Sequence, residues 1–322
     1  MSQADEKTSA MPHPLSVCII ARNDAARIEG CLRSVQEISP EVIVVDTGST
    51  DATAQIAGRC GARVEHFTWC DDFSAARNFS LKSATGDWIL VLDTDEALAP
   101  GQASLLQELT AQTSEFGYRC RIRNALPNGG EFISLGTRLF RNEPRIRFVG
   151  RVHEQIDQAL HDSGHRASLS EVTILHSGYG VDESTNRGKA ARNLKGLLLD
   201  LKDDPNNTFV ALKIGQLYIT SGEPDRAVEY LRRGVLASDP ALAAEGYNSL
   251  AGMHAARHEF EPALRACAES IARVPYQRMG YVIISQILNA MGRLHDAEAQ
   301  LGIARSITGP SHLYSDLPAI PS

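Results

Sequence analysis

Apolar and polar positions follow two different periods along the first half of the chain. Short apolar runs rich in valine and isoleucine predict buried strands, and stretches with apolar residues every three or four positions predict amphipathic helices. Strands that alternate with helices favour an α/β fold with a mostly parallel sheet flanked by helices. The predicted strands are residues 15–21, 42–45, 63–67 and 88–92, and the predicted helices are residues 24–35, 52–60 and 74–84.

Beyond residue 180 the pattern is helical throughout and repeats itself. Ala227, Ala263 and Ala297 occupy the same place in three segments that follow one another at 36 and 34 residues. Helix–turn–helix units with this period are typical of tetratricopeptide repeats, which stack into a curved superhelix. The concave face of such a superhelix often binds peptides. The repeats are equally compatible with a bracing role or with a homodimer.

Composition and charge narrow the class of protein. The 322 residues carry a net charge of −7, which argues against a nucleic-acid partner because nucleic-acid binding needs a clustered basic surface. No apolar run is long enough for a membrane span and the N-terminus has no apolar signal core, so we expect a cytoplasmic protein. The six cysteines lack paired metal spacing and predict reduced thiols.

Three polar turns follow predicted strands, at residues 22–24, 46–51 and 93–95. In open parallel sheets, ligands bind beyond the carboxyl ends of the strands, so the three turns together favour a nucleotide site. Asp93 and Asp95 stand two residues apart after the strand 88–92, where oxygen ligands on a short tether suit Mg²⁺ or Mn²⁺. The alternative for Asp46 and Asp51 is that they only shape a turn and cap a helix.

Four ordered segments, residues 17–24, 44–51, 69–78 and 86–96, resemble the motifs of family 2 glycosyltransferases. The resemblance covers roughly the first 195 residues and is greatest to bacterial members with a helical-repeat tail. It implies the GT-A fold, which binds nucleotide sugars, and a domain division into a tail (1–13), a GT-A domain (14–195), a tetratricopeptide-like domain (196–308) and a second tail (309–322).

The resemblance also implies how the donor is held. Asp46 would contact the nucleobase, Asp51 would support that turn, and Arg77 would approach the base or the diphosphate. Thr47 departs from the family pattern, since many relatives have a second acidic residue there. The identity of the nucleotide is therefore less secure than the class of donor.

For the metal, the resemblance implies a divalent cation, Mn²⁺ or Mg²⁺, bound at Asp93 and Asp95, with Asp95 as the safer direct ligand. His176 follows another apolar run and matches the position from which GT-A enzymes often recruit a late histidine to the metal. The alternative is a structural histidine at the end of a strand.

An inverting transfer needs a group that takes the acceptor's proton. Glu154 stands where the family has an acidic residue in this role, and His153 is the rival because its pKa lies close to operating pH. Five arginines in the same region are candidates for offsetting diphosphate charge, or else form a solvated face. They are Arg138, Arg141, Arg145, Arg147 and Arg151.

Together these features predict a metal-dependent, inverting glycosyltransferase. It would transfer a sugar from a nucleotide-diphosphate sugar, with a UDP-sugar as the expected donor, to a peptide, protein or glycan acceptor, the first two delivered by the repeats. The competing prediction is a repeat scaffold with a degenerate transferase domain. Nucleotidyl transfer on a related sheet would usually need a glycine-rich first loop, and residues 22–24 are not such a loop.

Overall fold

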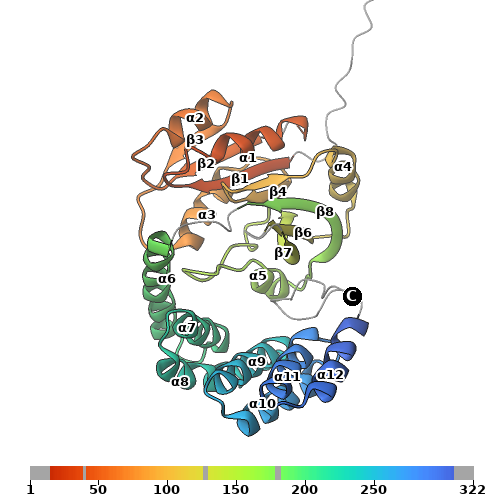
Figure 1. The fold of residues 1–322 in the computed structure, drawn as a ribbon. Helices are drawn as coiled ribbons and strands as arrows, with labels where there is room; N and C mark the ends of the chain where they lie inside the picture. Colours follow the sequence, from red (N-terminus) through yellow and green to blue (C-terminus); the bar gives the residue numbers. More distant parts are fainter. Residues whose placement is uncertain (1–14, 39–40, 126–129, 178–182, 308–322) are drawn as a thin grey trace, which may run out of the picture. The chain divides into compact units, whose positions relative to one another are not determined.

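The computed structural model describes residues 15–38, 41–125, 130–177 and 183–307 (Figure 1). The chain divides into two compact units, one made of residues 1–127 and 135–179 and the other of residues 128–134 and 180–322. The tails predicted at 1–13 and 309–322 lie outside the described residues. The domain limits predicted from the sequence, with a boundary at residue 195, stay a prediction.

The first unit is built on a mixed sheet with the strand order β3-β2-β1-β4-β7-β6-β8-β5. Four neighbouring strands, β3, β2, β1 and β4, run parallel as predicted, whereas β7 is antiparallel to β4 and β5 is antiparallel to β8. The strands are β1 (Leu15–Ala21), β2 (Glu41–Asp46), β3 (Arg63–His66), β4 (Trp88–Leu92), β5 (Glu96–Leu98), β6 (Gly117–Ala125), β7 (Glu131–Arg141) and β8 (Ser168–His176).

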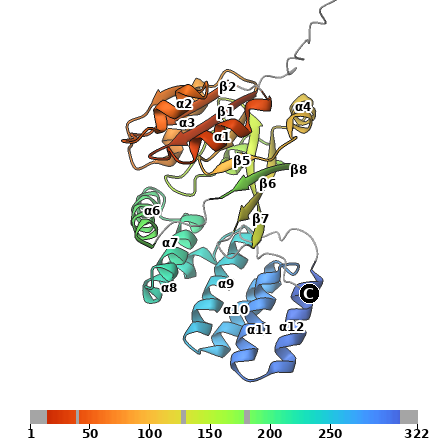
Figure 2. The same cartoon turned by 45° about the horizontal axis from the view of Figure 1, so that its top comes forward.

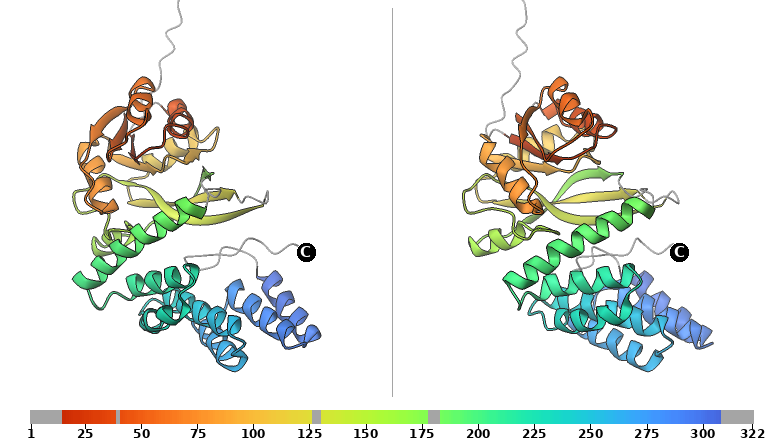
Figure 3. Two further views of the ribbon diagram at one scale, coloured as in Figure 1. Left: turned by 60° about the vertical axis from the view of Figure 1, so that its left-hand side comes forward. Right: turned by 90° about the vertical axis from the view of Figure 1, so that its left-hand side faces the viewer.

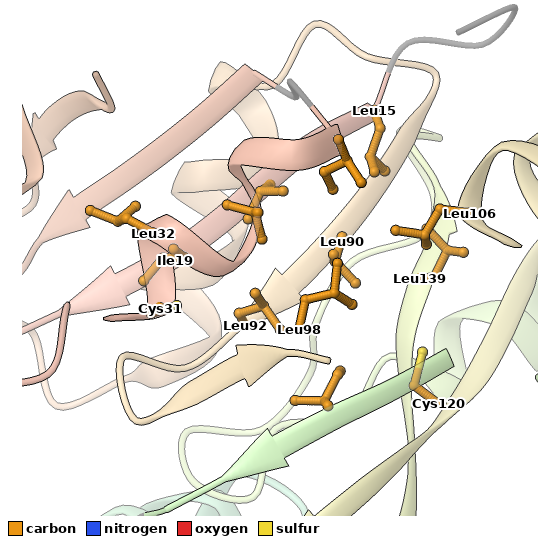
Figure 4. Packing of buried hydrophobic residues seen from close by; sticks show 14 of the residues in the cluster. Leu15, Ile19, Cys31, Leu32, Leu90, Leu92, Leu98, Leu106, Cys120 and Leu139 are labelled. Atoms are coloured by element: carbon orange, nitrogen blue, oxygen red, sulfur yellow. The ribbon is translucent and has the colours of Figure 1, made fainter. Parts of the chain in front are cut away.

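Helices cover both faces of this sheet because successive residues of its central strands point to opposite faces. On one face, Leu90 and Leu92 of β4 pack with residues of α1, α2 and α4, and Figure 4 shows Leu92 close to Leu98 and Leu106 close to Leu139. On the other face, Ile89 and Val91 pack with residues of α3 and α5. The helices are α1 (Ile28–Ser34), α2 (Thr53–Arg59), α3 (Phe73–Ser83), α4 (Ala103–Ala111) and α5 (Asp157–Asp162), with a short 3-10 helix at Gln36–Ile38.

Between residues 183 and 307 the second unit consists of helices and their connecting turns. The long helix α6 (Glu183–Asp203), best seen in Figure 3, leads into three helix pairs that follow one another in chain order in Figure 2. The pairs pack closely where small residues allow it: a Cβ on Gly215 would lie 2.7 Å from the Leu231 side chain. The paired helices are α7 (Thr208–Thr220) with α8 (Pro224–Gly234), α9 (Pro240–Ala256) with α10 (Phe260–Arg273), and α11 (Arg278–Ala290) with α12 (Leu294–Ser306).

The predicted fold class, a helix-flanked α/β sheet followed by helical repeats, is confirmed. Of the strand and helix limits predicted above, one differs by more than a single residue. The first helix begins at Ile28 and not at residue 24, because Asn23 adopts a left-handed backbone (φ 56°) and Asp24 closes a turn with Arg27. Among the helices of the described residues, none has the length and apolar character that spanning a bilayer requires.

Candidate active site

The turns that follow β1 and β2 are held to each other by side chains. Asn23 donates its backbone N–H to Ser49 Oγ at 2.9 Å and accepts the Thr50 N–H on its side-chain oxygen at 2.7 Å. Asp51 accepts the N–H groups of Thr53 at 2.9 Å and Ala25 at 3.1 Å. The Thr53 hydroxyl also donates to Asp51, and this hydrogen bond, together with those from the N–H groups, lowers the pKa of Asp51. Asp51 therefore holds the turn together, as a purely structural aspartate would, and its part in donor binding stays a prediction.

Asp46 lies at the carboxyl end of β2 and is almost fully buried. Its carboxylate accepts the Ser49 N–H at 3.1 Å and lies 3.4 Å from the His66 ring. The neighbouring Thr47 is also buried and donates its hydroxyl to the carbonyl of Ala21 at 3.2 Å. Thr47 therefore binds the end of β1, a role that an acidic side chain could not take because a carboxylate has no hydrogen to donate.

Arg77 lies at the centre of a group of charged side chains, the Arg77 cluster, which also contains Asp93 and Glu154. It projects from α3, is 6% exposed, and donates to Asp93 Oδ1 and Glu154 Oε1, both at 2.6 Å. Burial alone would lower the pKa of Arg77, but the two carboxylates raise it above its ordinary value. The guanidinium, which lies 77 residues before Glu154 in the sequence, thus joins one acid of the predicted metal motif to the predicted base.

Arg138 and Glu96 complete this cluster, and their pairing was not predicted from the sequence. Arg138 on β7 lies 2.7 Å from Glu96 and 3.5 Å from Asp93. Burial raises the pKa of Glu96. Burial would also raise the pKa of Asp93, but the positive charges of Arg77 and Arg138 hold that pKa well below its usual range. The available signals were an arginine directly before the apolar pair Leu139 and Phe140 and a third acid directly after Asp95.

The loop that carries His153 and Glu154 is tied to α3. Asn78 accepts the backbone N–H of Phe148 at 2.8 Å and donates to its carbonyl at 2.9 Å, and the Phe73 N–H donates to the Arg151 carbonyl. Within the loop His153 has a left-handed backbone with φ 55°, which is uncommon for a residue other than glycine. Its side chain is exposed, whereas that of Glu154 is 13% exposed and faces Arg77.

Asp95 and His176 lie next to this cluster. His176 Nε2 is 3.6 Å from Asp95 Oδ2, and Arg27 reaches the same oxygen at 3.4 Å. The proximity of His176 lowers the pKa of Asp95, and Asp95 raises that of His176. The geometry therefore brings together two of the three predicted metal ligands. Among the residues described, no three His, Cys, Asp or Glu side chains are grouped as a metal-ligand set.

The other predicted residues fall outside the cluster. Arg141 stacks on the Trp88 ring and donates to the carbonyl of Gln112, and Arg147 donates to the carbonyls of Glu143 and Ile146. All six cysteines are free. Of the five arginines considered for the diphosphate, Arg138 is the one that the structure places beside Asp93.

Comparison with known families identifies the first unit. Residues 16–169 match the family described as Glycosyl transferase family 2. The chain contains a family 2 glycosyltransferase domain. The match spans the Arg77 cluster and Asp95 and ends before His176, so the predicted histidine ligand lies just beyond the part that defines the family.

Several known proteins resemble the chain over the family 2 domain and beyond it. A TPR repeat-containing protein of Synechococcus elongatus is 37% identical over 232 residues, covering 70% of this chain and 57% of that protein. The prophage-derived glycosyltransferase SunS of Bacillus subtilis is 27% identical over 227 residues, with 69% and 53% covered. The chain thus spans about half the length of these relatives. The crystal structure of S. aureus TarS 1-349 aligns over 90% of this chain and 88% of its own, at 16% identity and a TM-score of 0.44.

Proposed function

We propose that this protein is a metal-dependent, inverting glycosyltransferase that uses a nucleotide-diphosphate sugar, with a UDP-sugar as donor and a peptide, protein or glycan as acceptor. The family 2 domain supports the reaction class. The observation that carries the proposal is the Arg77 cluster, in which one guanidinium holds an acid of the predicted metal motif and the predicted base at 2.6 Å each.

The donor would lie against the three turns at the ends of β1, β2 and β4. Asp46 is proposed to meet the nucleobase, and Asp51 to fix the turn that presents it. Arg77 offers a group for the diphosphate: its Nη1 is buried, and within the described residues it has no hydrogen-bond acceptor. A buried N–H donor without an acceptor is costly, and a phosphate oxygen would satisfy it with a charge-assisted hydrogen bond.

A divalent cation, Mn²⁺ or Mg²⁺, fits the donor set of Asp95 and His176. A carboxylate oxygen and an imidazole nitrogen 3.6 Å apart are close enough to share one ion. Asp93 is the weaker candidate for direct ligation because Arg77 and Arg138 already contact its two oxygens. When bound, the cation would neutralise charge on the departing diphosphate.

Glu154 is proposed as the base. Its Oε1 is bound by Arg77, which fixes the carboxylate in one orientation, and Oε2 of the same carboxylate would take the proton of the acceptor as the acceptor attacks the anomeric carbon. His153 is the alternative. Its exposed side chain and left-handed backbone suit a residue that contacts the acceptor from the loop.

A peptide or protein acceptor would be held by the helical unit. A groove of about 840 Å³ lies between α7 and α9, with Ile219 and Met253 among its apolar walls and Lys213 and Glu245 paired at 2.9 Å at its polar end. A Cβ on Gly252, in this groove, would meet no atom within 4 Å. Gly252→Leu should therefore fill the groove without disturbing the helix. If the groove holds the acceptor, this variant loses transfer and keeps donor hydrolysis, whereas Gly302→Leu on α12 keeps both.

The test of the proposal is hydrolysis of UDP-, GDP- and dTDP-sugars by the purified protein with Mn²⁺, Mg²⁺ or EDTA, followed as release of the nucleoside diphosphate. We expect release from one donor that EDTA abolishes. Asp95→Ala should remove the metal stimulation with the fold intact, and Glu154→Gln should keep donor binding and lose transfer. No release, together with no calorimetric binding of any donor, would support the scaffold alternative instead.

A further inference from the structure

Asn124 on β6 breaks the pattern of the strand that carries it. The inward-facing residues of β6 are Tyr118, Cys120 and Ile122, all buried and all packed in the core of the first unit. Asn124 is the next inward-facing residue and is 3% exposed. Strands favour β-branched and aromatic residues at such places, and a buried amide is costly unless it is hydrogen-bonded. The position of the asparagine therefore calls for a reason beyond packing.

Asn124 is the register partner of His176 across the parallel pair β6–β8. Its side-chain nitrogen donates to the carbonyl of Ile122 at 3.0 Å, which fixes which end of the amide faces the histidine. The oxygen Oδ1 then lies 2.8 Å from His176 Nδ1. Because a side-chain amide oxygen only accepts, His176 Nδ1 must carry the hydrogen in this pair.

This hydrogen bond decides what the other ring nitrogen can do. With the hydrogen on Nδ1, the neutral imidazole has its lone pair on Nε2, which is the nitrogen directed at Asp95. Metal-binding histidines generally donate their second ring N–H to an oxygen in this way, and that contact sets both the tautomer and the ring orientation.

We propose that Asn124 is a positioning residue that presents His176 Nε2 to a cation held beside Asp95. The inference rests on the proposed metal-dependent function, and it gives a part in that function to Asn124, which lies outside the four sequence motifs. Asn124 does not touch the cation. It acts through the tautomer and the orientation of His176.

The first test observes the unaltered protein. In protein labelled with ¹⁵N-histidine, at a pH where the imidazole is neutral, His176 should show a protonated Nδ1 and an unprotonated Nε2. His176→Gln identifies the signals by their loss. A neutral His176 with the hydrogen on Nε2 would overturn the proposal directly.

The second test measures Mn²⁺ affinity, by the electron paramagnetic resonance signal of free Mn²⁺ in the presence of UDP. Asn124→Leu cannot accept the Nδ1 hydrogen, and we expect about a 10- to 100-fold weaker affinity, the usual effect of losing such a contact. Asn124→Asp keeps an acceptor oxygen and should retain most of the Mn²⁺ affinity. This variant keeps the proposal testable if the leucine variant fails to fold. Thr110→Val, which removes a buried hydroxyl that donates to Leu106 on α4, should bind Mn²⁺ like the unaltered protein.

The outcomes distinguish a failure of the proposed function from a failure of the role proposed for Asn124. If the unaltered protein binds no Mn²⁺ with UDP present, the metal dependence of the proposed function fails and the inference fails with it. If the protein binds Mn²⁺, and His176→Gln weakens binding while Asn124→Leu does not, the proposed function stands and the role of Asn124 is refuted. Equal affinity in all three would remove His176, and therefore Asn124, from the site.

Discussion

Replacing Arg77 by methionine should destabilise the first unit more than any surface substitution. The change removes the cation between Asp93 and Glu154 while keeping a long side chain of similar reach. Asp93 would retain Arg138 at 3.5 Å and is 34% exposed, but Glu154 is only 13% exposed and would lose the partner that neutralises it. The cost therefore comes mainly from the buried carboxylate of Glu154.

Removing one partner of a buried ion pair typically costs about 3–5 kcal/mol. For a unit of this size, each kcal/mol lowers the melting temperature by about 2–4 °C, so we expect a loss of about 6–20 °C. Urea unfolding followed by tryptophan fluorescence is a clean assay because both tryptophans, Trp69 and Trp88, belong to the first unit.

The control is Arg33→Met on α1. Arg33 also contacts a glutamate, Glu29, but both side chains are at least half exposed, so the change should stay within about 0.5 kcal/mol. A second comparison isolates the cause: adding Glu154→Gln to Arg77→Met removes the stranded charge and should restore part of the stability. If Arg77→Met is as stable as Arg33→Met, or if Glu154→Gln restores nothing, the account of Arg77 as a buried ionic bridge is wrong.

Three further predictions concern two glycines of the helical unit, the reactivity of two cysteines and the pH dependence of stability at Glu41. Gly215→Ala should lower the stability of the helical unit by about 1–3 kcal/mol, because the new Cβ would lie 2.7 Å from a leucine of α8. Gly302→Ala places its Cβ in open space and should stabilise α12 by about 0.5–1 kcal/mol. Thermal melts measure both effects. Disulfide-exchange reagents should modify the exposed Cys70 quickly in the native protein and Cys18 only after unfolding, since burial raises the pKa of Cys18 to about 12. Burial tends to raise the pKa of Glu41, but the hydrogen bonds to its carboxylate lower that pKa overall. The ionised carboxylate therefore stabilises the fold above its unfolded pKa, and this stabilisation is lost as the pH falls through the folded pKa. Glu41→Gln should lower the urea midpoint at pH 7 by the equivalent of about 1–2 kcal/mol and hardly change it in acid.

The sequence was sufficient for the parts of the fold that are local and periodic. The parallel strands before Asp93 were predicted because each is a short apolar run between turn residues, and the helix pairs because their period repeats. The strands from β5 to β8 were largely missed. In β6, arginines at 119, 121 and 123 alternate with the buried residues, so the strand has no continuous apolar run. Its neighbour β7 contains Gly136, which weakens the strand pattern further.

For the site, the sequence predicted which residue types gather but not how they pair. Motif order placed Arg77, Asp93 and Glu154 among the candidates. That one guanidinium contacts both acids depends on the path of the chain between α3 and the loop at 149–155, which no local pattern encodes. Asn124 was missed because its significance lies in the register between β6 and β8, and parallel register is fixed by tertiary packing.

The hydrogen bonds between Asn78 and Phe148 make two distant segments a single exchangeable piece. Because α3 and the loop that bears Glu154 are connected by these hydrogen bonds, a chimera that took residues 69–84 from a relative and kept residues 146–156 of this chain would have mismatched contacts next to Glu154. Exchanging both segments together would keep these contacts. Segments should therefore be exchanged between relatives as this pair, and substitutions in either one should be selected against the background of the other.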